Sequence, residues 1–542
     1  MNLTLPSVNV SGVDVAAEEG TVDDITGDDG YDVAVIGYGP VGMAAAALIG
    51  RLGHRVVVLE RYEGKYNLPR AAIFDDETMR TFAMLGVPDR LLPKLHVQRN
   101  YEWMNGAGDL LIEVDFAEVG RSGWAEWYMM YQPDLEDALD AYCRHSGEVD
   151  VRFGARVIGI EQSQATVSVT VDGWDRPVLA RFAVACDGGN SFVRHALAIP
   201  ERDYGFSEPW LVCDFRFRRP VRVPAARQVC DPVQPTSIIS LGPDHHRFSF
   251  MLDSEASFMT EREPERVWRR VAPYLTREDA ELIRAATYTF RSRVAERWRD
   301  GRVLLAGDAA HQMPPFLGQG MCSGVRDALN LSFKLDLVLS GVQPESLLDT
   351  FQSERDPHVR AVIAKGIELG RVQTVRDPGL AAQRDARLIA GRGTAPAKIS
   401  FPPLHAGMLG SGHGAGELFV QGMVSSGSST GRFDEVAGYG WIVLVRARLV
   451  PEIDTLTGLP AVRVIGVSDV AGLPGVLHDI DGVYTTWLDQ HHSDAVAIRP
   501  DFHVWGTSSG RDTPRLIAEF AALLRGRPNA ESAPSRGTVA LG

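Results

Sequence analysis

Residues 31–42 read Tyr-Asp-Val-Ala-Val-Ile-Gly-Tyr-Gly-Pro-Val-Gly. The apolar run at residues 32–36 is typical of a buried parallel strand. Residues 41–52 are rich in alanine and predict a helix that can pack close to a sheet, and residues 55–59 predict the next strand. Because the three elements follow one another at short spacing, the sequence predicts a βαβ unit.

The three glycines of this stretch have separate tasks. Gly37 permits the tight turn from strand to helix, Gly39 lets phosphate oxygens approach the backbone, and Gly42 lets helix and strand pack closely. The first residues of the helix, Pro40 and Val41, lie at its positive end, where free N–H groups favour an anion. The pattern therefore predicts a site for the pyrophosphate of a dinucleotide.

Glu60 follows the second predicted strand. A carboxylate at this place can accept hydrogen bonds from both hydroxyls of a ribose, which suits an unphosphorylated ribose such as that of FAD or NAD. We include the adjacent Arg61 as a candidate contact of the same dinucleotide.

A second strand-then-turn segment occurs at residues 187–194, Asp-Gly-Gly-Asn-Ser-Phe-Val-Arg, after an apolar run at residues 182–186. Taken alone, Asp187 would cap a helix that begins near Ser191.

A third such segment is residues 307–311, Gly-Asp-Ala-Ala-His, which follows an apolar run at residues 302–306. Gly307 ends the strand, and Asp308 would accept a hydrogen bond from a hydroxyl of a sugar-alcohol chain. For His311 we favour a structural role over a catalytic one.

In this order the three segments resemble those of the single-component FAD-dependent aromatic-ring hydroxylases, over about residues 31–370. The resemblance implies an enzyme that binds FAD, takes NADH or NADPH as a transient co-substrate, and uses O2 to hydroxylate a phenolic ring through a flavin C4a-hydroperoxide. It also implies that the segment at Asp187 contacts FAD and the nicotinamide. The sequence has no second glycine fingerprint, which fits a donor that docks transiently.

The same resemblance supplies further site residues. By position, Arg70 resembles the arginine that reaches the FAD pyrophosphate, and Gln132 resembles a glutamine that contacts the cofactor. Asp308 takes the place of the acceptor for the ribityl chain. A rigid lip before a helix predicted at residues 320–339 offers bare amides, which would stabilise negative charge on the reduced flavin. The remaining cofactor candidates in this part are Gly307, Pro315, Gly318, Gly320 and Met321.

Residues 201–295 alternate apolar and polar side chains, which predicts antiparallel strands with one buried face. Such a sheet would form the second wall of a cleft and bind the substrate. A substrate carboxylate would pair with an arginine, although a solvated strand face is the more usual place for each arginine here. The substrate-binding candidates are Arg216, Arg218, Arg247 and Pro314, and no catalytic residue is assigned.

Within the class, residues 208–212 and 318–324 are most similar to 3-(3-hydroxyphenyl)propionate hydroxylases, although Cys322 stands where many relatives have asparagine. We therefore expect that substrate and its 2,3-dihydroxy product, with NADH as the favoured donor. Another phenol or an aromatic polyketide stays open as the alternative, and a non-catalytic nucleotide-binding protein as a remote one. A flavin-dependent halogenase is disfavoured because Trp124 and Trp127 lack the spacing of its tryptophan motif.

The expected fold class is α/β, α+β overall, with a Rossmann-like FAD-binding domain, an inserted antiparallel sheet and a C-terminal thioredoxin-like domain. The last assignment comes from a resemblance of the region after residue 415 to the C-terminal domain of the phenol-hydroxylase branch. That region has no cysteine, so packing or dimer contact is expected instead of a redox role. The expected boundaries are 1–30 for a disordered acidic tail, 31–200 and 296–370 for the FAD-binding domain, 201–295 for the substrate domain, 371–414 for a helix and linker, and 415–530 for the thioredoxin-like domain.

Composition restricts the partners. The net charge of −15 over 542 residues disfavours binding to nucleic acid or anionic lipid. No apolar stretch of about 18 residues occurs in the sequence, so no membrane span is expected. The five cysteines are scattered without a Cys-x-x-Cys pair, which argues against a metal site and a disulfide framework and fits a cytoplasmic protein. A small phenol and O2 are the expected partners, and a homodimer stays open.

Overall fold

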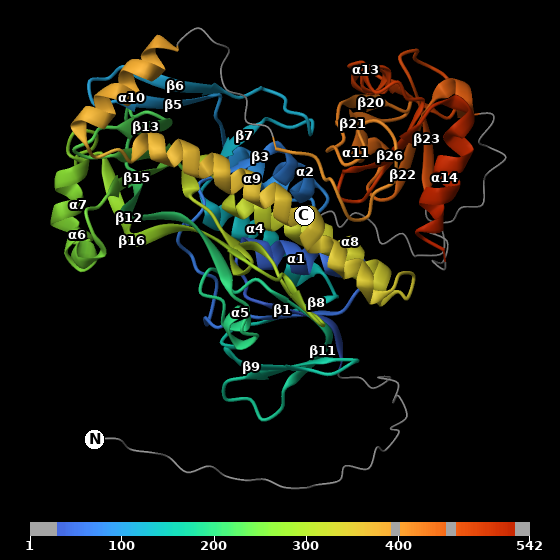
Figure 1. The fold of residues 1–542 in the computed structure, drawn as a ribbon, viewed down its shortest axis with the longest axis horizontal. Helices are drawn as coiled ribbons and strands as arrows, with labels where there is room; N and C mark the ends of the chain where they lie inside the picture. The colour runs from blue at the N-terminus through green and yellow to red at the C-terminus, as the bar shows by residue number, and fades with distance from the viewer. Residues whose placement is uncertain (1–29, 392–400, 451–461, 526–542) are drawn as a thin grey trace.

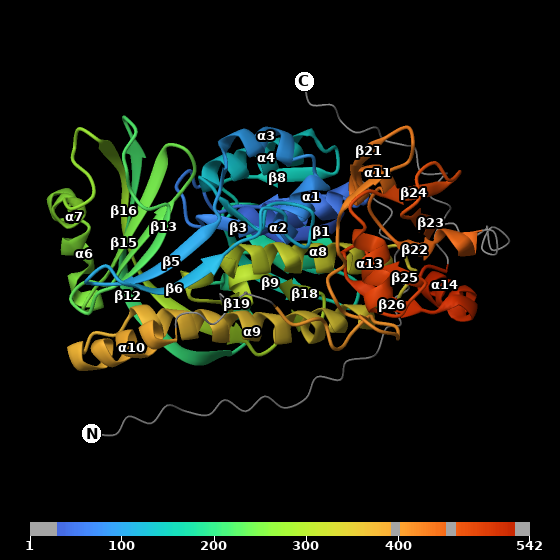
Figure 2. The same cartoon turned by 90° about the horizontal axis from the view of Figure 1, so that it is seen from above.

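The computed structural model describes residues 30–391, 401–450 and 462–525 (Figure 1). All but the last residue of the predicted acidic tail, and part of the predicted linker, lie outside the described residues. The described parts contain two eight-stranded sheets, a seven-stranded sheet and a three-stranded sheet. Figures 1 and 2 show the two larger sheets next to each other, with the seven-stranded C-terminal domain packed at the opposite end of the molecule from helices α6 and α7.

The first sheet is the Rossmann-like sheet that the glycine stretch predicts. Strand β1 (Tyr31–Ile36) lies between β2 (Val56–Leu59) and β11 (Val178–Ala185), and all three are parallel. The order is β17-β18-β11-β1-β2-β8, and β9 and β10 extend from β11. The other strands are β8 (Val149–Arg152), β9 (Val157–Gln162), β10 (Val167–Val171), β17 (Arg299–Asp300) and β18 (Val303–Leu305). The chain thus returns to this sheet after the substrate domain, as predicted.

Helix α1 (Pro40–Arg51) packs against β1, β2 and two further helices, α4 (Gln132–His145) and α8 (Gln319–Leu339). Its run of four alanines, residues 44–47, is fully buried. Because these side chains are small, α1 lies close to both the sheet and α8. The predicted helices at residues 41–52 and 320–339 are confirmed to within a residue.

The second sheet is the predicted antiparallel substrate sheet, in the order β19-β16-β12-β15-β14-β13-β5-β6. Its strands are β12 (Glu201–Phe217), β13 (Ala226–Cys230), β14 (Thr236–Ser240), β15 (His245–Met251), β16 (Ala280–Ala295), β19 (His311–Gln312), β5 (Asn100–Asn105) and β6 (Leu110–Asp115). The last two come from the first half of the chain and were not predicted. They join through a parallel pairing of β5 with β13. Alternation reports that a strand has one buried face, but it does not report which strand lies beside it.

Short elements fill the space around the two large sheets. A three-stranded sheet is formed by β3 (Ile73–Asp75), β4 (His96–Val97) and β7 (Trp127–Met129). The short helices of this part of the molecule are α2 (Asp76–Ala83), α3 (Pro88–Leu91), α5 (Phe192–Ala196), α6 (Phe258–Glu261) and α7 (Pro264–Val271).

The C-terminal sheet contains parallel and antiparallel pairings, in the order β21-β20-β24-β23-β22-β25-β26. Its core, β23-β22-β25-β26, has β22 and β23 parallel and the other two pairings antiparallel, as the predicted thioredoxin-like domain requires. Its elements are β20 (Met423–Ser425), β21 (Thr430–Arg432), β22 (Ile442–Arg446), β23 (Arg463–Ser468), β24 (Val476–Asp479), β25 (Ala495–Ile498), β26 (Val504–Ser508), α11 (Phe433–Ala437), α13 (Val483–Gln490) and α14 (Thr513–Ala522).

Two helices connect the ends of the molecule. Helix α9 (Thr350–Gln373) and helix α10 (Pro378–Ala390) run almost in line from the C-terminal domain to the substrate sheet (Figure 2). Where the start of α9 meets the C-terminal domain, Arg499 is fully buried and donates to Glu354 of α9 and to Asp501. Lys334 of α8 lies 2.9 Å from the same Glu354 carboxylate. The C-terminal domain is therefore fixed to the FAD-binding domain by buried charges.

Candidate active site

The three sequence segments meet at one edge of the first sheet. Ile36, at the end of β1, is paired with Ala185, and Ala185 is paired with Leu305 at the end of β18. Because these strands are parallel, the turns at Gly37 and Asp187 and the turn after Leu305 leave the sheet at the same edge. Ligands of open α/β sheets bind at this carboxyl edge.

Two glycines of the first turn are required by packing. Gly37 has a φ of +100°, and a Cβ there would lie 2.6 Å from the carbonyl oxygen of Cys186. A Cβ on Gly42 would lie 2.1 Å from the carbonyl oxygen of Gly37. Gly39 is different, because a Cβ there would meet no atom within 4 Å. The space beside Gly39 is where the sequence predicts a pyrophosphate.

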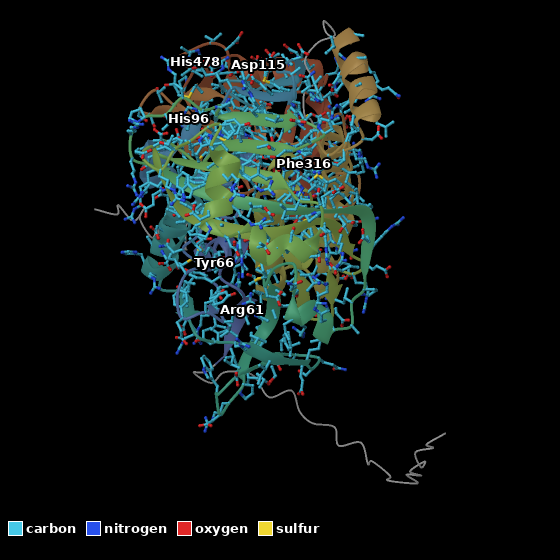
Figure 3. All side chains as sticks on the ribbon, turned by 90° about the vertical axis from the view of Figure 1, so that its left-hand side faces the viewer. Arg61, Tyr66, His96, Asp115, Phe316 and His478 are labelled. Atoms are coloured by element: carbon cyan, nitrogen blue, oxygen red, sulfur yellow. The ribbon has the colours of Figure 1, made fainter. Side chains whose placement is uncertain are left out.

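An open cavity of about 670 Å³ begins at this turn. Its size is within the range of small-molecule and cofactor sites. Among its lining residues are the predicted Gly37, Gly39, Glu60, Arg61, Arg70 and Asp187, together with Lys65, Tyr66, Glu136 and Arg156, which were not predicted. Figure 3 shows Arg61 and Tyr66 on the same side of the molecule. No local pattern marks the four additional residues, because each reaches the cavity from a loop or from a strand or helix whose place depends on the whole fold.

The carboxylate of Glu60 is held at the cavity wall by two backbone amides. Tyr38 donates its N–H to Oε2 at 2.7 Å, and Tyr62 donates its N–H to Oε1 at 3.1 Å. Each oxygen keeps a second lone pair. Glu60 can therefore accept ribose hydroxyls, as its sequence position predicts.

Asp187 both caps a helix and presents a free oxygen. Val193 at the start of α5 donates its N–H to Oδ2 at 3.1 Å, so the helix-capping interpretation holds for that atom. The other oxygen, Oδ1, is buried and has no partner among the described residues. Burial raises the pKa of Asp187, against the hydrogen bonds from Ser191 and Val193. A buried acceptor without a donor at the cavity wall fits a ligand that carries hydroxyls or amides.

Asp308 lies at the turn that follows β18 and is not among the residues that line the cavity. Its side chain remains accessible, and it makes no hydrogen bond to any described residue. The surrounding protein reduces the solvation of the carboxylate and so raises the pKa of Asp308, whereas the charges of His311 and Arg70 act to lower that pKa. Arg194 donates to the carbonyls of Ala309 and Gly189 and so ties the second and third segments together.

Buried charges hold the turn that carries Asp308. His311 is buried, and its Nε2 lies 2.6 Å from Oδ2 of Asp327. The same Oδ2 accepts the N–H of Gly307 at 3.1 Å, and Arg355 donates to Oδ1. Burial opposes ionisation of Asp327, but His311 and Arg355 outweigh it and lower its pKa. This arrangement matches the structural role favoured for His311.

The predicted lip precedes helix α8. Pro315 is exposed, Pro314 is buried, and Gly318 has a φ of +62° at the N-terminus of the helix. The first turn of α8, which includes Gly320 and Met321, leaves backbone N–H groups without helical partners. Further along α8, a Cβ on Gly324 would lie 3.1 Å from Cα of Gly307, so this helix passes directly beside the aspartate turn.

The three arginine candidates for the substrate do not share one environment. Arg216 is exposed and pairs with Glu281, and Arg218 is exposed. Arg247, in contrast, is buried against Asp214 at 2.6 Å, so the expectation of a solvated strand face is wrong for it. Sequence alternation gave no sign of this, since it does not identify a cross-strand partner.

The side-chain amide of Gln132 makes several hydrogen bonds within the protein. Its amide oxygen accepts the N–H groups of Arg70 at 2.8 Å and Ala71 at 2.5 Å. Its amide nitrogen donates to Glu136 at 2.5 Å. Gln132 therefore holds the segment that carries Arg70. Burial raises the pKa of Glu136 to about 7, against the hydrogen bond from Gln132 and the charge of Arg70.

A family model described as FAD binding domain matches residues 30–365, which is more than half of the chain. The chain belongs to this family. A second model, described as HcaD C-terminal domain, matches residues 416–523. No helix within the described ranges has both the length and the apolar character needed to cross a membrane.

Two curated relatives align along almost the whole chain. A probable NADH-specific resorcinol 4-hydroxylase of Rhodococcus jostii (strain RHA1) is 48% identical over 528 residues, which covers 94% of this chain and 98% of that one. A 3-(3-hydroxy-phenyl)propionate/3-hydroxycinnamic acid hydroxylase of Mycobacterium sp. (strain JLS) is 31% identical over 533 residues, with 92% of each chain covered.

Solved structures share the fold. Aklavinone-11 hydroxylase with FAD and aklavinone matches with a TM-score of 0.74 and 24% identity, over 92% of this chain and all of that one. A p-nitrophenol 4-monooxygenase from Pseudomonas putida DLL-E4 matches with a TM-score of 0.60 and 26% identity, over 67% of this chain and 95% of that one. The predictions of cofactor and reaction class are confirmed: the protein is an FAD-dependent aromatic-ring monooxygenase with NADH or NADPH as electron donor.

Proposed function

We propose that this enzyme hydroxylates resorcinol, or a similarly small uncharged phenol, with NADH as the electron donor. NADH supplies two electrons, one oxygen atom of O2 enters the ring, and the other leaves as water. For resorcinol, hydroxylation at carbon 4 gives 1,2,4-trihydroxybenzene. The 48% identity with the Rhodococcus relative over almost the full length of both chains carries this proposal.

The exposure and ion pairing of the three candidate arginines on the substrate sheet favour an uncharged substrate over a phenylpropionate. A buried carboxylate needs a cationic partner, because an unpaired buried charge is costly. Arg216 and Arg218 face solvent, and Arg247 already pairs with Asp214. None of these three candidates is therefore available as a fork for a substrate carboxylate, which makes 3-(3-hydroxyphenyl)propionate the second candidate.

We also propose how the chain holds FAD. Glu60 would accept the adenosine ribose hydroxyls, the N-terminus of α1 beside Gly39 and the Arg70 side chain would hold the pyrophosphate, and Asp308 would accept from the ribityl chain. When bound, FAD supplies hydride acceptance and oxygen activation. The free N–H groups at the start of α8 would favour negative charge nearby, and the sheet would exclude water from the phenol.

Replacing Asp308 with alanine tests this placement. We expect FAD to bind about five- to 150-fold more weakly, because a hydroxyl that loses its acceptor costs about 1–3 kcal/mol. Titration of the apoprotein with FAD, followed by flavin fluorescence, gives the dissociation constant. Asp203→Ala is a matched control, because Asp203 is exposed at the start of β12. If Asp308→Ala binds FAD as tightly as the unchanged protein, Asp308 is not a ligand.

Steady-state kinetics test the substrate. With resorcinol we expect NADH consumption that matches the amount of 1,2,4-trihydroxybenzene formed. We expect its kcat/KM to be at least about tenfold higher than that of 3-(3-hydroxyphenyl)propionate, because none of Arg216, Arg218 and Arg247 is available to pair with the carboxylate of the latter. Chromatography identifies the product, and a peroxide assay measures uncoupling. A higher kcat/KM with the propionate, or NADH consumption that yields only peroxide from resorcinol, would contradict the proposal.

A further inference from the structure

A row of three charged residues crosses the substrate sheet. Asp214 of β12 is paired in register with Arg247 of β15 on one side and Arg284 of β16 on the other. All three are buried. Arg247 donates to both oxygens of Asp214, at 2.6 and 3.1 Å, and Arg284 lies 3.3 Å from one of them. Two guanidinium groups thus share one carboxylate, so their other N–H groups need further acceptors.

Three of these further hydrogen bonds reach the FAD-binding domain, and a fourth joins Arg284 to the hydroxyl of Tyr288 on its own strand. Arg247 donates to the carbonyl oxygen of Arg70 at 2.5 Å and to that of Pro69 at 2.9 Å. Arg284 also donates to the carbonyl of Pro69. The single carboxylate of Asp214 balances only one of the two guanidinium charges. The carbonyl oxygens carry partial negative charge and stabilise the other.

The amides of the same segment are held from the other side. Gln132 accepts the N–H groups of Arg70 and Ala71 through one oxygen. Residues 69–71 belong to no helix or strand. Their place is therefore set by side chains of β15, β16 and α4, and not by a backbone ladder of their own.

The segment has a direct connection to the cofactor cavity. The Arg70 side chain lines the cavity, and its guanidinium carbon lies 4.3 Å from the centre of the Tyr66 ring. Its accessible guanidinium is the group proposed to meet the pyrophosphate. A shift of the backbone at Pro69 and Arg70 would move that group away from the space beside Gly39.

From this geometry we infer that Arg247 and Arg284, anchored by Asp214, are positioning residues that place Arg70 for the FAD pyrophosphate. This role rests on the proposed placement of FAD. It also makes the substrate sheet a part of the cofactor site, because two of its strands reach across to the segment that carries Arg70.

The test is a double-mutant cycle on FAD affinity, measured by titrating the apoprotein without any phenol. Arg247→Lys keeps a charge beside Asp214 but loses the planar fork that bridges Asp214 and the two carbonyls. We expect the FAD dissociation constant to rise about tenfold, as the loss of about one charge-assisted hydrogen bond implies. In an Arg70→Ala background the same change should have no further effect, because the two residues act through one contact.

Two controls make the result interpretable. Arg227→Met removes another arginine of the same sheet, one that pairs with Glu102 on the neighbouring strand β5, and should leave FAD affinity unchanged. If Arg247→Lys does not fold, Arg284→Lys replaces it in the same cycle with the same expectation. The thermal unfolding temperature of each apoprotein shows whether the fold is intact.

The outcomes separate the inference from the proposed function. If Arg247→Lys weakens FAD binding by the same factor with and without Arg70, its effect is general and the inference is overturned. If Arg70→Ala leaves FAD affinity unchanged, Arg70 does not hold FAD and the inference falls with that placement. Neither result depends on the phenol, so the double-mutant cycle still tests the inference if resorcinol is not the substrate.

Discussion

Gly42→Ala is expected to give a protein that is purified without FAD. The added Cβ would lie 2.1 Å from the carbonyl oxygen of Gly37, and the nearby atoms are backbone and cannot rotate away. Helix α1 would have to move off the sheet, which costs about 1–3 kcal/mol of stability or more. The N–H groups at its start would move away from the pyrophosphate, and we expect at least about a hundredfold loss of FAD affinity, roughly 3 kcal/mol of binding free energy. The ratio of flavin to protein after purification, and FAD titration of the apoprotein, measure the loss.

Gly39→Ala is the matched control. A Cβ at Gly39 meets no atom of the protein within 4 Å, so the apoprotein should unfold at an unchanged temperature. FAD should nevertheless bind more weakly, since that Cβ would occupy the space needed by the pyrophosphate. Equal loss of stability in both variants, or full FAD affinity in Gly39→Ala, would contradict the roles assigned to the two glycines.

Arg499→Met is expected to lower the free energy of unfolding by about 3–5 kcal/mol, because it leaves buried carboxylates without their main partner. Arg499 is fully buried and donates to Glu354 of α9 as well as to Asp501. Burial alone would raise the pKa of Glu354, but the charges of Arg499 and Lys334 lower it to about 2. Urea denaturation of the apoprotein gives the loss, and the C-terminal domain should become sensitive to protease first.

Arg515→Met provides the comparison for this second change. Arg515 lies on α14 of the same domain with a side chain that is 70% exposed. Its loss should alter the free energy of unfolding by no more than about 0.5 kcal/mol. A similarly small effect of Arg499→Met would mean that the buried charges do not hold the two domains together.

The turns of the site were predictable because their requirements are local. Gly37 and Gly42 are constrained by atoms of the turn itself or of the strand beside it, so residue type and spacing are enough to indicate them. The turn that carries Asp308 could be predicted for the same reason, since it comes shortly after a recognisable buried strand, β18. The parallel order of the sheet then brings these turns to one edge.

The residues that support the site were not predictable in the same way. Arg247 is separated by 177 positions from Arg70, whose carbonyl it bonds, and Gln132 by 62 positions from the same residue. A single sequence shows each of them only as a polar residue on a predicted strand or helix. The pairing of β5 with β13 was missed for a similar reason, because strand neighbours far apart in the chain leave no trace in the alternation of either strand.

The central claim is that one FAD molecule is held jointly by the turn at Gly37–Gly42 and by Asp308. The most direct test is a crystal structure of the protein with FAD bound. The account predicts the adenosine ribose within hydrogen-bond distance of Glu60, the pyrophosphate beside Gly39 and Arg70, and a ribityl hydroxyl within hydrogen-bond distance of Asp308. A flavin whose ribityl chain is held elsewhere, with Asp308 facing only water, would contradict it.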